Sequence, residues 1–253
     1  MSSFLPRRTV LGAGLAGVAG LAVGTPAAAA DGTGDQYADL AFPTTRVARA
    51  ARQLVTDEQQ PYLRNHSLRS FLFGRAAAAQ AGRRPGQDYN AEVMFLICVL
   101  HDMGLTERAA TSQRFELDGA DFAARFLEQH GITDRRVDTV WDGIALHTSF
   151  GFHQSPVFAR RRPPEIAIAQ EGIGIDLTGS PDQLPAGYAE RVHAAYPRHG
   201  GARILTDAII AQGLADPRKA PPMTLPGEIL HQRHPEVPYM TWEGFLDASG
   251  WDD

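Results

Sequence analysis

The feature that most limits how this chain can fold is an apolar run that ends on two polar residues. Eight consecutive apolar residues, Val93 to Leu100, are followed directly by His101 and Asp102. Moving an unpaired carboxylate from water into an apolar interior costs several kcal/mol, and metal coordination is a common way of offsetting that cost. The run therefore predicts a buried helix whose C-terminal end reaches a metal-binding site.

Two further residues extend this candidate site. His66 lies upstream in the chain, and Asp176 lies downstream in an apolar segment that contains glycine. Two imidazoles and two carboxylates would form a mixed nitrogen and oxygen site that suits one divalent zinc ion, with iron or manganese as alternatives. Taken singly, His66 is also compatible with a helix cap and Asp176 with a polar helix end, so the prediction depends on all four residues together.

The geometry of a helix limits where His101 and Asp102 can meet one ion. Successive helical residues point about 100° apart, so both side chains reach the same point only at a helix end that abuts the site. Gly104 follows at the position of a C-terminal cap, which predicts that the helix ends there.

Helical periodicity dominates the chain, with no internal repeat and no alternation of strand and helix patterns. This predicts an all-α fold in which a helical bundle surrounds the metal site. The expected helices span residues 43–56, 66–81, 91–102, 119–130, 133–147, 164–177, 184–195 and 201–212.

The first 30 residues have the layout of a bacterial signal peptide. Arg7 and Arg8 precede a weakly apolar stretch rich in Gly and Ala, and small residues stand just before Asp31. The paired arginines indicate the twin-arginine export machinery as a partner. The apolar stretch is shorter than the ~20 residues that span a bilayer, although a retained membrane anchor is the alternative. We expect the mature protein to be exported, to the periplasm or the exterior, without a stable membrane anchor.

Four segments follow from this layout. We expect a signal peptide over residues 1–30, a linker over 31–42, the metal-dependent domain over 43–215, and a proline-rich extension over 216–253. A short terminal helix is expected to begin near Thr241 in this extension.

Charge and cysteine content narrow the function further. The formal charge is −5, and about −7 without residues 1–30, so nucleic acid is not an expected partner. The one basic run, Arg160 to Arg162, is expected to be a solvated loop. Cys98 is the only cysteine, which excludes an internal disulfide, and its place in the apolar run predicts a buried core residue.

Four motifs occur in a defined order along the chain. They are NHSLRSFLFG at residues 65–74, HDMGLT at 101–106, RFELDGA at 114–120 and IALHTS at 144–149. This pattern resembles the cyanamide hydratase branch of the HD superfamily, and the resemblance covers about residues 40–215. It implies that His66, His101, Asp102 and Asp176 are the metal ligands. It also implies a metal, usually zinc, that helps to add water across the nitrile of cyanamide and so forms urea.

The resemblance suggests roles for other residues around a small polar substrate. His147 is the expected proton donor beside the catalytic Asp102, and Thr148 is expected to orient water or substrate. Further residues are expected in the second shell or the substrate pocket, with helix capping or simple exposure as their alternatives. They are Arg69, Glu116, Asp118 and His153.

Two other functions remain open at this point. The first is a phosphohydrolase, in which Arg69, Arg75 and Arg114 would bind phosphate and His147 with His153 would hold a second metal. Leu105 stands where many such enzymes carry a lysine. The second is an exported, non-catalytic binding protein that keeps the ion for stability. A structural metal site would be closed by protein ligands, whereas a catalytic site keeps a position for water.

Overall fold

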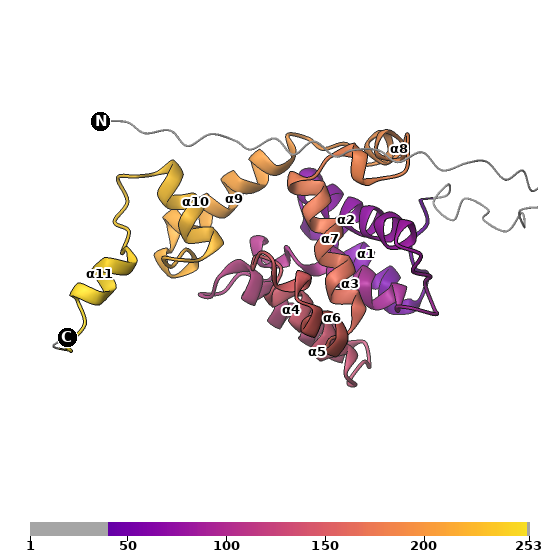
Figure 1. Cartoon of the computed structure of the whole chain (residues 1–253), viewed down its shortest axis with the longest axis horizontal. Helices are drawn as coiled ribbons and strands as arrows, with labels where there is room; N and C mark the ends of the chain where they lie inside the picture. Colours follow the sequence, from indigo (N-terminus) through magenta and orange to yellow (C-terminus); the bar gives the residue numbers. More distant parts are fainter. Residues whose placement is uncertain (1–39, 252–253) are drawn as a thin grey trace, which may run out of the picture. The chain divides into compact units, whose positions relative to one another are not determined.

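The computed structural model describes residues 40–251, and within them every regular element is a helix, which confirms the all-α prediction (Figure 1). The predicted signal peptide and most of the predicted linker lie outside the described residues. All described residues fall in one compact unit. The α-helices are α1 (Arg46–Glu58), α2 (Pro61–Gln80), α3 (Ala91–Leu100), α4 (Phe115–Gln129), α5 (Arg136–Ala145), α6 (Pro156–Arg161), α7 (Pro164–Thr178), α8 (Tyr188–Ala195), α9 (Gly201–Ala215), α10 (Leu225–Arg233) and α11 (Trp242–Asp247).

Helix α3 is the centre of the bundle and packs against α1, α2, α5 and α7. Its residues Val93 to Leu100 are all buried, which explains why the run is apolar on every face rather than along one stripe. Asn90 caps its N-terminus by accepting hydrogen bonds from the backbone N–H groups of Glu92 and Val93. The helix ends at Leu100, so His101 and Asp102 emerge in the interior of the protein.

Helices α2 and α7 pack closely against each other because glycines face each other at their contact. A Cβ on Gly172 would lie 2.1 Å from the carbonyl oxygen of Ser70 and 2.7 Å from the backbone nitrogen of Gly74. A Cβ on Gly74 would lie 2.7 Å from the carbonyl oxygen of Ile168. This close approach brings His66 of α2 and Asp176 of α7 within reach of each other.

Gly104 has a different role from the one predicted. It does not adopt a left-handed cap but lies in η1 (Met103–Leu105), a short 3₁₀ helix. A Cβ there would lie 1.9 Å from the carbonyl oxygen of Phe115, so glycine lets η1 pack directly on the start of α4. The contact fixes the chain just after Asp102.

Several helices begin elsewhere than periodicity indicated. Helix α2 begins at Pro61, where proline suits the first helical turn, so His66 lies in its second turn and not at its start. Helix α4 begins at Phe115 and thus includes Glu116 and Asp118, while α8 begins only at Tyr188. Helix α6 contains part of the basic run that was expected to be a loop.

The C-terminal extension is joined to the bundle. Helix α10, which was not predicted, packs on α9, and α9 contacts α2. The Lys219 ammonium donates to Asp118 Oδ2 of α4 at 2.6 Å, and both side chains are buried. Helix α11 begins at Trp242, and Thr241 is its N-cap.

None of the helices in residues 40–251 combines the length and the apolar character that crossing a membrane requires.

Candidate metal centre

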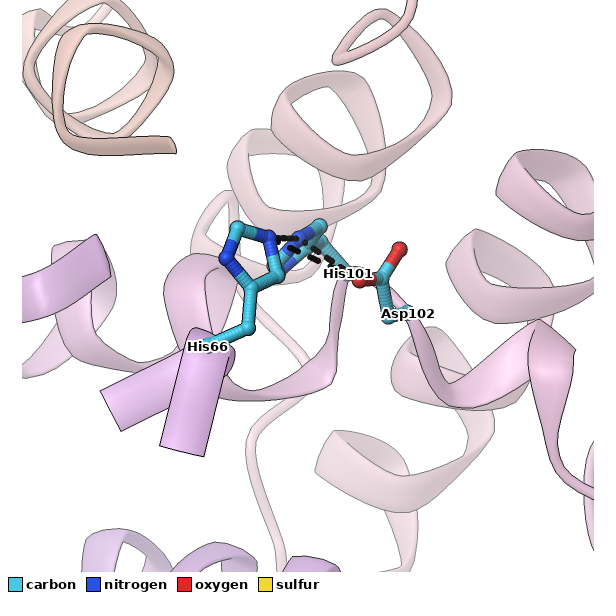
Figure 2. A group of neighbouring side chains, drawn as sticks. All are labelled: His66, His101 and Asp102. Carbon is cyan, nitrogen blue, oxygen red and sulfur yellow. Dashed lines mark hydrogen bonds and ion pairs between the residues drawn. The ribbon is translucent and has the colours of Figure 1, made fainter. Parts of the chain in front are cut away.

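Three of the four predicted ligands meet at one point, where His66 of α2 faces the consecutive residues His101 and Asp102 at the end of α3 (Figure 2). His66 Nε2 lies 3.2 Å from His101 Nε2, and His101 Nε2 lies 3.2 Å from Asp102 Oδ2. The third distance among these three atoms, from His66 Nε2 to Asp102 Oδ2, is 3.7 Å. All three side chains are buried.

The outer ring nitrogens fix which tautomer each histidine adopts. His66 Nδ1 lies 2.7 Å from Asp176 Oδ2, and His101 Nδ1 lies 2.7 Å from the backbone carbonyl oxygen of Cys98. Both partners are acceptors, so we assign the proton of each neutral imidazole to Nδ1. The two Nε2 lone pairs therefore face each other and Asp102 Oδ2, which has no hydrogen-bond donor among the described residues.

Three converging lone pairs in a buried place require a positive charge between them. Around a tetrahedral zinc ion with nitrogen ligands at about 2.0–2.1 Å, donor atoms lie about 3.3 Å apart, close to the distances seen here. In the protein alone, burial opposes a charge on His101, yet the carboxylate of Asp102 raises the pKa of His101 overall. Burial likewise opposes the charge of Asp102, and His101 outweighs it and lowers the pKa of Asp102. These residues could hold a metal ion.

Asp176, the fourth predicted ligand, lies behind His66 and not among the converging atoms. Besides holding His66 Nδ1, it accepts two hydrogen bonds from Arg69, from Nε at 2.7 Å and from Nη2 at 2.8 Å. Arg198 Nη1 lies 3.2 Å from Asp176 Oδ1. Burial opposes the charge of Asp176, but His66 and Arg69 outweigh it and hold the pKa of Asp176 below its usual range. This is the carboxylate–histidine arrangement that orients a metal-ligating imidazole.

Arg69 is fully buried and all of its donor nitrogens are engaged. Beyond the two bonds to Asp176, Nη1 donates to the carbonyl oxygens of Tyr196 and Pro197, each at 3.1 Å. Four of its five N–H groups therefore hold Asp176 and the chain between α8 and α9.

His147 packs edge-on against His101, with the two ring centroids 4.9 Å apart. Its Nδ1 donates to the carbonyl oxygen of Ile144 at 2.6 Å, which leaves Nε2 as an acceptor 3.7 Å from Asp102 Oδ1. Burial and the nearby charge of His101 lower the pKa of His147 to about 4, so the ring is neutral at neutral pH. Gln170 of α7 donates to the backbone carbonyl of His147 at 2.5 Å and fixes this position.

Thr148 and Glu116 form a polar pair next to this histidine. The Thr148 hydroxyl donates to Glu116 Oε1 at 3.1 Å, and Arg114 Nη1 lies 3.0 Å from the same oxygen. Burial raises the pKa of Glu116. The other oxygen, Oε2, is buried and accepts no hydrogen bond from the described part of the chain.

Asp118 holds other groups than the ligand imidazole predicted for it, while the pocket role of His153 stays a prediction. Asp118 accepts from the backbone N–H of Thr111 at 2.8 Å, bonds the Thr111 hydroxyl and pairs with Lys219, so it organises the segment before α4. His153 lies in η2 (Phe152–Gln154) and packs edge-on against Phe152. Neither Glu116 nor Asp118 bonds a ligand imidazole; Asp176 and the Cys98 carbonyl do that.

Three groups at this centre were not predicted from the sequence: the Cys98 carbonyl, Arg198 and Gln170. The Cys98 carbonyl carries no signature, because every residue has one. Arg198 follows a proline in an irregular segment, so no periodicity marks it. Gln170 did leave a signal, since it is a polar residue on a helix face that is otherwise apolar. The Cys98 thiol itself is buried, which raises its pKa and fits the predicted core role.

The comparisons with known proteins cover part of the chain. No protein-family model matches the sequence. Two cyanamide hydratases of Saccharomyces cerevisiae, DDI2 and DDI3, are each 33% identical to it over 108 residues, which is 42% of this chain and 47% of each relative. The chain thus spans about half the length of the curated relatives it matches, and within that span it is similar to cyanamide hydratases.

Proposed function

We propose that this protein is a metal-dependent hydratase of the HD type that adds water to a small nitrile, with cyanamide as substrate and urea as product. The observation that carries the proposal is the convergence of His66 Nε2, His101 Nε2 and Asp102 Oδ2 on one buried point. The similarity to two cyanamide hydratases supports the choice of reaction.

His66, His101 and Asp102 would hold the ion, for which zinc is our choice because two imidazoles and one carboxylate are a common ligand set of catalytic zinc. Three protein ligands leave a position for water or substrate. A divalent ion bound there would lower the pKa of water toward neutrality and polarise the nitrile nitrogen.

Hydration transfers the oxygen of water to the nitrile carbon and both protons of water to the nitrile nitrogen. His147 Nε2 is a lone-pair acceptor beside the centre, so it takes a proton from the attacking water and delivers it to the nitrogen. Thr148, whose hydroxyl hydrogen is engaged by Glu116, keeps its oxygen as an acceptor that orients the water or the amino group.

The surroundings favour a small, neutral substrate. Two of the arginines that a phosphohydrolase would use to bind phosphate already pair with carboxylates. Arg69 bonds Asp176, and Arg114 pairs with Glu116. Arg75 donates to the carbonyl of Ala41, away from the centre. Phe115 packs edge-on against His147 and gives the site an apolar wall. A phosphate ester would have to compete with these carboxylates for the Arg69 and Arg114 guanidinium groups, which argues against a phosphohydrolase.

We also propose that residues 1–30 direct the protein out of the cell by the twin-arginine route. Replacing Arg7 and Arg8 together by Lys should retain the protein in the cytoplasm, whereas replacing Arg83 and Arg108 should not. Export of both variants would refute this part of the proposal.

The decisive experiment is metal analysis of the purified protein followed by two assays on the same sample. We expect one zinc per chain, release of urea from cyanamide, and no release of phosphate from nucleotides. The Asp102→Ala variant should lose both the metal and the activity. Phosphate release without urea would favour the phosphohydrolase, and metal with neither product would favour a non-catalytic protein.

A further inference from the structure

A basic groove lies at the far end of α3 from the metal centre. It has a volume of about 770 Å³ and is lined by five arginines. They are Arg135 and Arg136, at the start of α5, and Arg160, Arg161 and Arg162, at the end of α6 and just beyond it. This volume lies in the range of small-molecule sites.

Three helices begin at this groove. The first residues of α3, α5 and α7, which are Ala91, Arg136 and Pro164, all line it. The three helices contact one another in pairs (Figure 1). Each helix start carries the positive end of a helix dipole, equivalent to about half a unit charge, so three such ends add to the field of the arginines.

Pairing within the groove leaves a surplus of positive charge. Its three carboxylates, Asp88, Glu92 and Glu165, already have partners: Arg84, Arg136 and the backbone N–H of Asn90. Arg162 lies 3.5 Å from Asp142. The guanidinium groups that remain make no ion pair or hydrogen bond within residues 40–251; they belong to Arg135, Arg160 and Arg161.

We propose that this groove binds a soluble small molecule with two or more anionic groups, such as phosphates or carboxylates. Several guanidinium groups from two separate helices can bond separate anionic groups of one ligand, and Arg forms two parallel bonds to a carboxylate or phosphate. The net charge of the chain is −5, so general attraction of anions does not account for such binding. The proposal is independent of the hydratase function, because the groove shares no residue with the metal centre.

The first test uses a fluorescent trianion, naphthalenetrisulfonate, which chelates metal ions poorly, with the full-length, metal-loaded protein at low salt. We expect saturable binding of one molecule per chain, and at least about tenfold weaker binding of naphthalenemonosulfonate because one charge engages fewer arginines. Absence of saturable binding would overturn the proposal.

The second test places the site. Replacing Arg135, Arg160 and Arg161 together by Gln should weaken trianion binding at least about tenfold, since each lost charge-assisted contact is worth up to that factor. The matched control replaces three exposed arginines outside the groove, Arg108, Arg125 and Arg203, by Gln and should bind like the wild type. Equal affinity in the groove variant, or equal loss in the control, would refute the assignment.

A competition experiment then distinguishes a phosphate ligand from a carboxylate ligand. Propanediol bisphosphate and benzenetricarboxylate are each titrated against bound naphthalenetrisulfonate. The stronger competitor identifies a phosphate or a carboxylate ligand, and failure of both to compete would contradict the assigned class.

Discussion

At the candidate metal centre, each candidate imidazole ligand makes a hydrogen bond through the ring nitrogen that faces away from the cluster. The two hydrogen-bond acceptors differ in charge. His66 bonds the carboxylate of Asp176, whereas His101 bonds the neutral carbonyl of Cys98. A carboxylate partner increases the basicity of a ligand imidazole. A metal ion bound at this centre would therefore gain affinity from Asp176 through His66, although Asp176 does not lie among the converging atoms.

This arrangement predicts different results for the two aspartates. Asp176→Asn should still bind one zinc ion per chain but about 10–100-fold more weakly, because the orienting charge behind His66 is gone. Asp102→Asn should bind no zinc that survives gel filtration. Competition with a coloured chelator measures both affinities. If Asp176→Asn loses zinc as completely as Asp102→Asn, Asp176 is a direct ligand, as the sequence alone suggested.

His147 has a separate, catalytic prediction. His147→Ala should keep its zinc, because His66, His101 and Asp102 remain, but turnover should fall by about 10²–10⁴-fold if the ring transfers a proton. Metal analysis and a urea assay on the same sample separate binding from chemistry. Loss of zinc in this variant would show that His147 is a ligand.

The site could be predicted from the sequence as far as residue types carry the signal. His101 and Asp102 stood out because they follow an apolar run, and the order His66, His101, Asp102 and Asp176 along the chain completed the set. The sequence did not reveal on which face of His66 the Asp176 carboxylate lies. That depends on Arg69 and Arg198, whose charges draw Asp176 away from the converging atoms.

At the scale of elements, the contact between α2 and α7 determines the geometry of the centre, since these helices carry His66 and Asp176. Glycine is required where the two backbones touch, at Gly74 and Gly172. Gly174, two residues further along α7, faces open space. Helix α7 thus contains one glycine with no room for a Cβ, Gly172, and one where a Cβ would meet no atom, Gly174.

Alanine substitutions at these glycines should have opposite effects. Gly172→Ala should lower the free energy of unfolding by at least about 1–3 kcal/mol, because its Cβ meets backbone atoms that cannot move aside. Gly174→Ala should raise it by about 0.5–1 kcal/mol, because alanine favours the helix and nothing opposes its methyl group. Urea unfolding monitored by circular dichroism measures both. A stabilised Gly172→Ala would contradict the close packing.

Helix boundaries were predictable where a residue with a local role marks them. Helix α7 was expected over residues 164–177 and spans Pro164–Thr178, because proline marks its start. Helix α4 was expected to begin at Gly119, yet it begins at Phe115, where Arg114 provides no side-chain cap. Burial of Phe115 against η1 sets that boundary, and packing of this kind leaves no local pattern in the sequence.

At the scale of the whole molecule, one buried ion pair fastens the C-terminal extension to the bundle. Lys219 reaches Asp118 of α4, which also organises the segment around Thr111. Breaking a buried pair by removing one partner leaves an uncompensated charge. Residues beyond α9 therefore contribute to the stability of the domain that holds the metal centre.

Substitutions at the neighbouring residues Lys219 and Arg218 test whether the buried ion pair stabilises the fold. Lys219→Ala should lower the free energy of unfolding by about 3–5 kcal/mol, because Asp118 stays buried without its cation. Arg218→Ala should lower it much less, since the Arg218 side chain in its ion pair with Asp216 is largely exposed to water. Thermal unfolding of both variants checks this. Equal melting temperatures for the two variants would show that the Lys219 pair does not stabilise the fold.

The distances in sequence across the centre also bear on when, during synthesis, the site can exist. His66 and Asp176 are 110 residues apart, and Arg69 bonds carbonyls 127 and 128 residues away. At about 5–20 residues per second, a ribosome needs roughly 5–20 s to travel from His66 to Asp176. Until Asp176 is made, the nascent chain carries His66, and from 35 residues later also His101, without the carboxylate that orients His66. An ion that requires the oriented His66 would therefore bind late, after most of the chain has folded, and would not guide that folding.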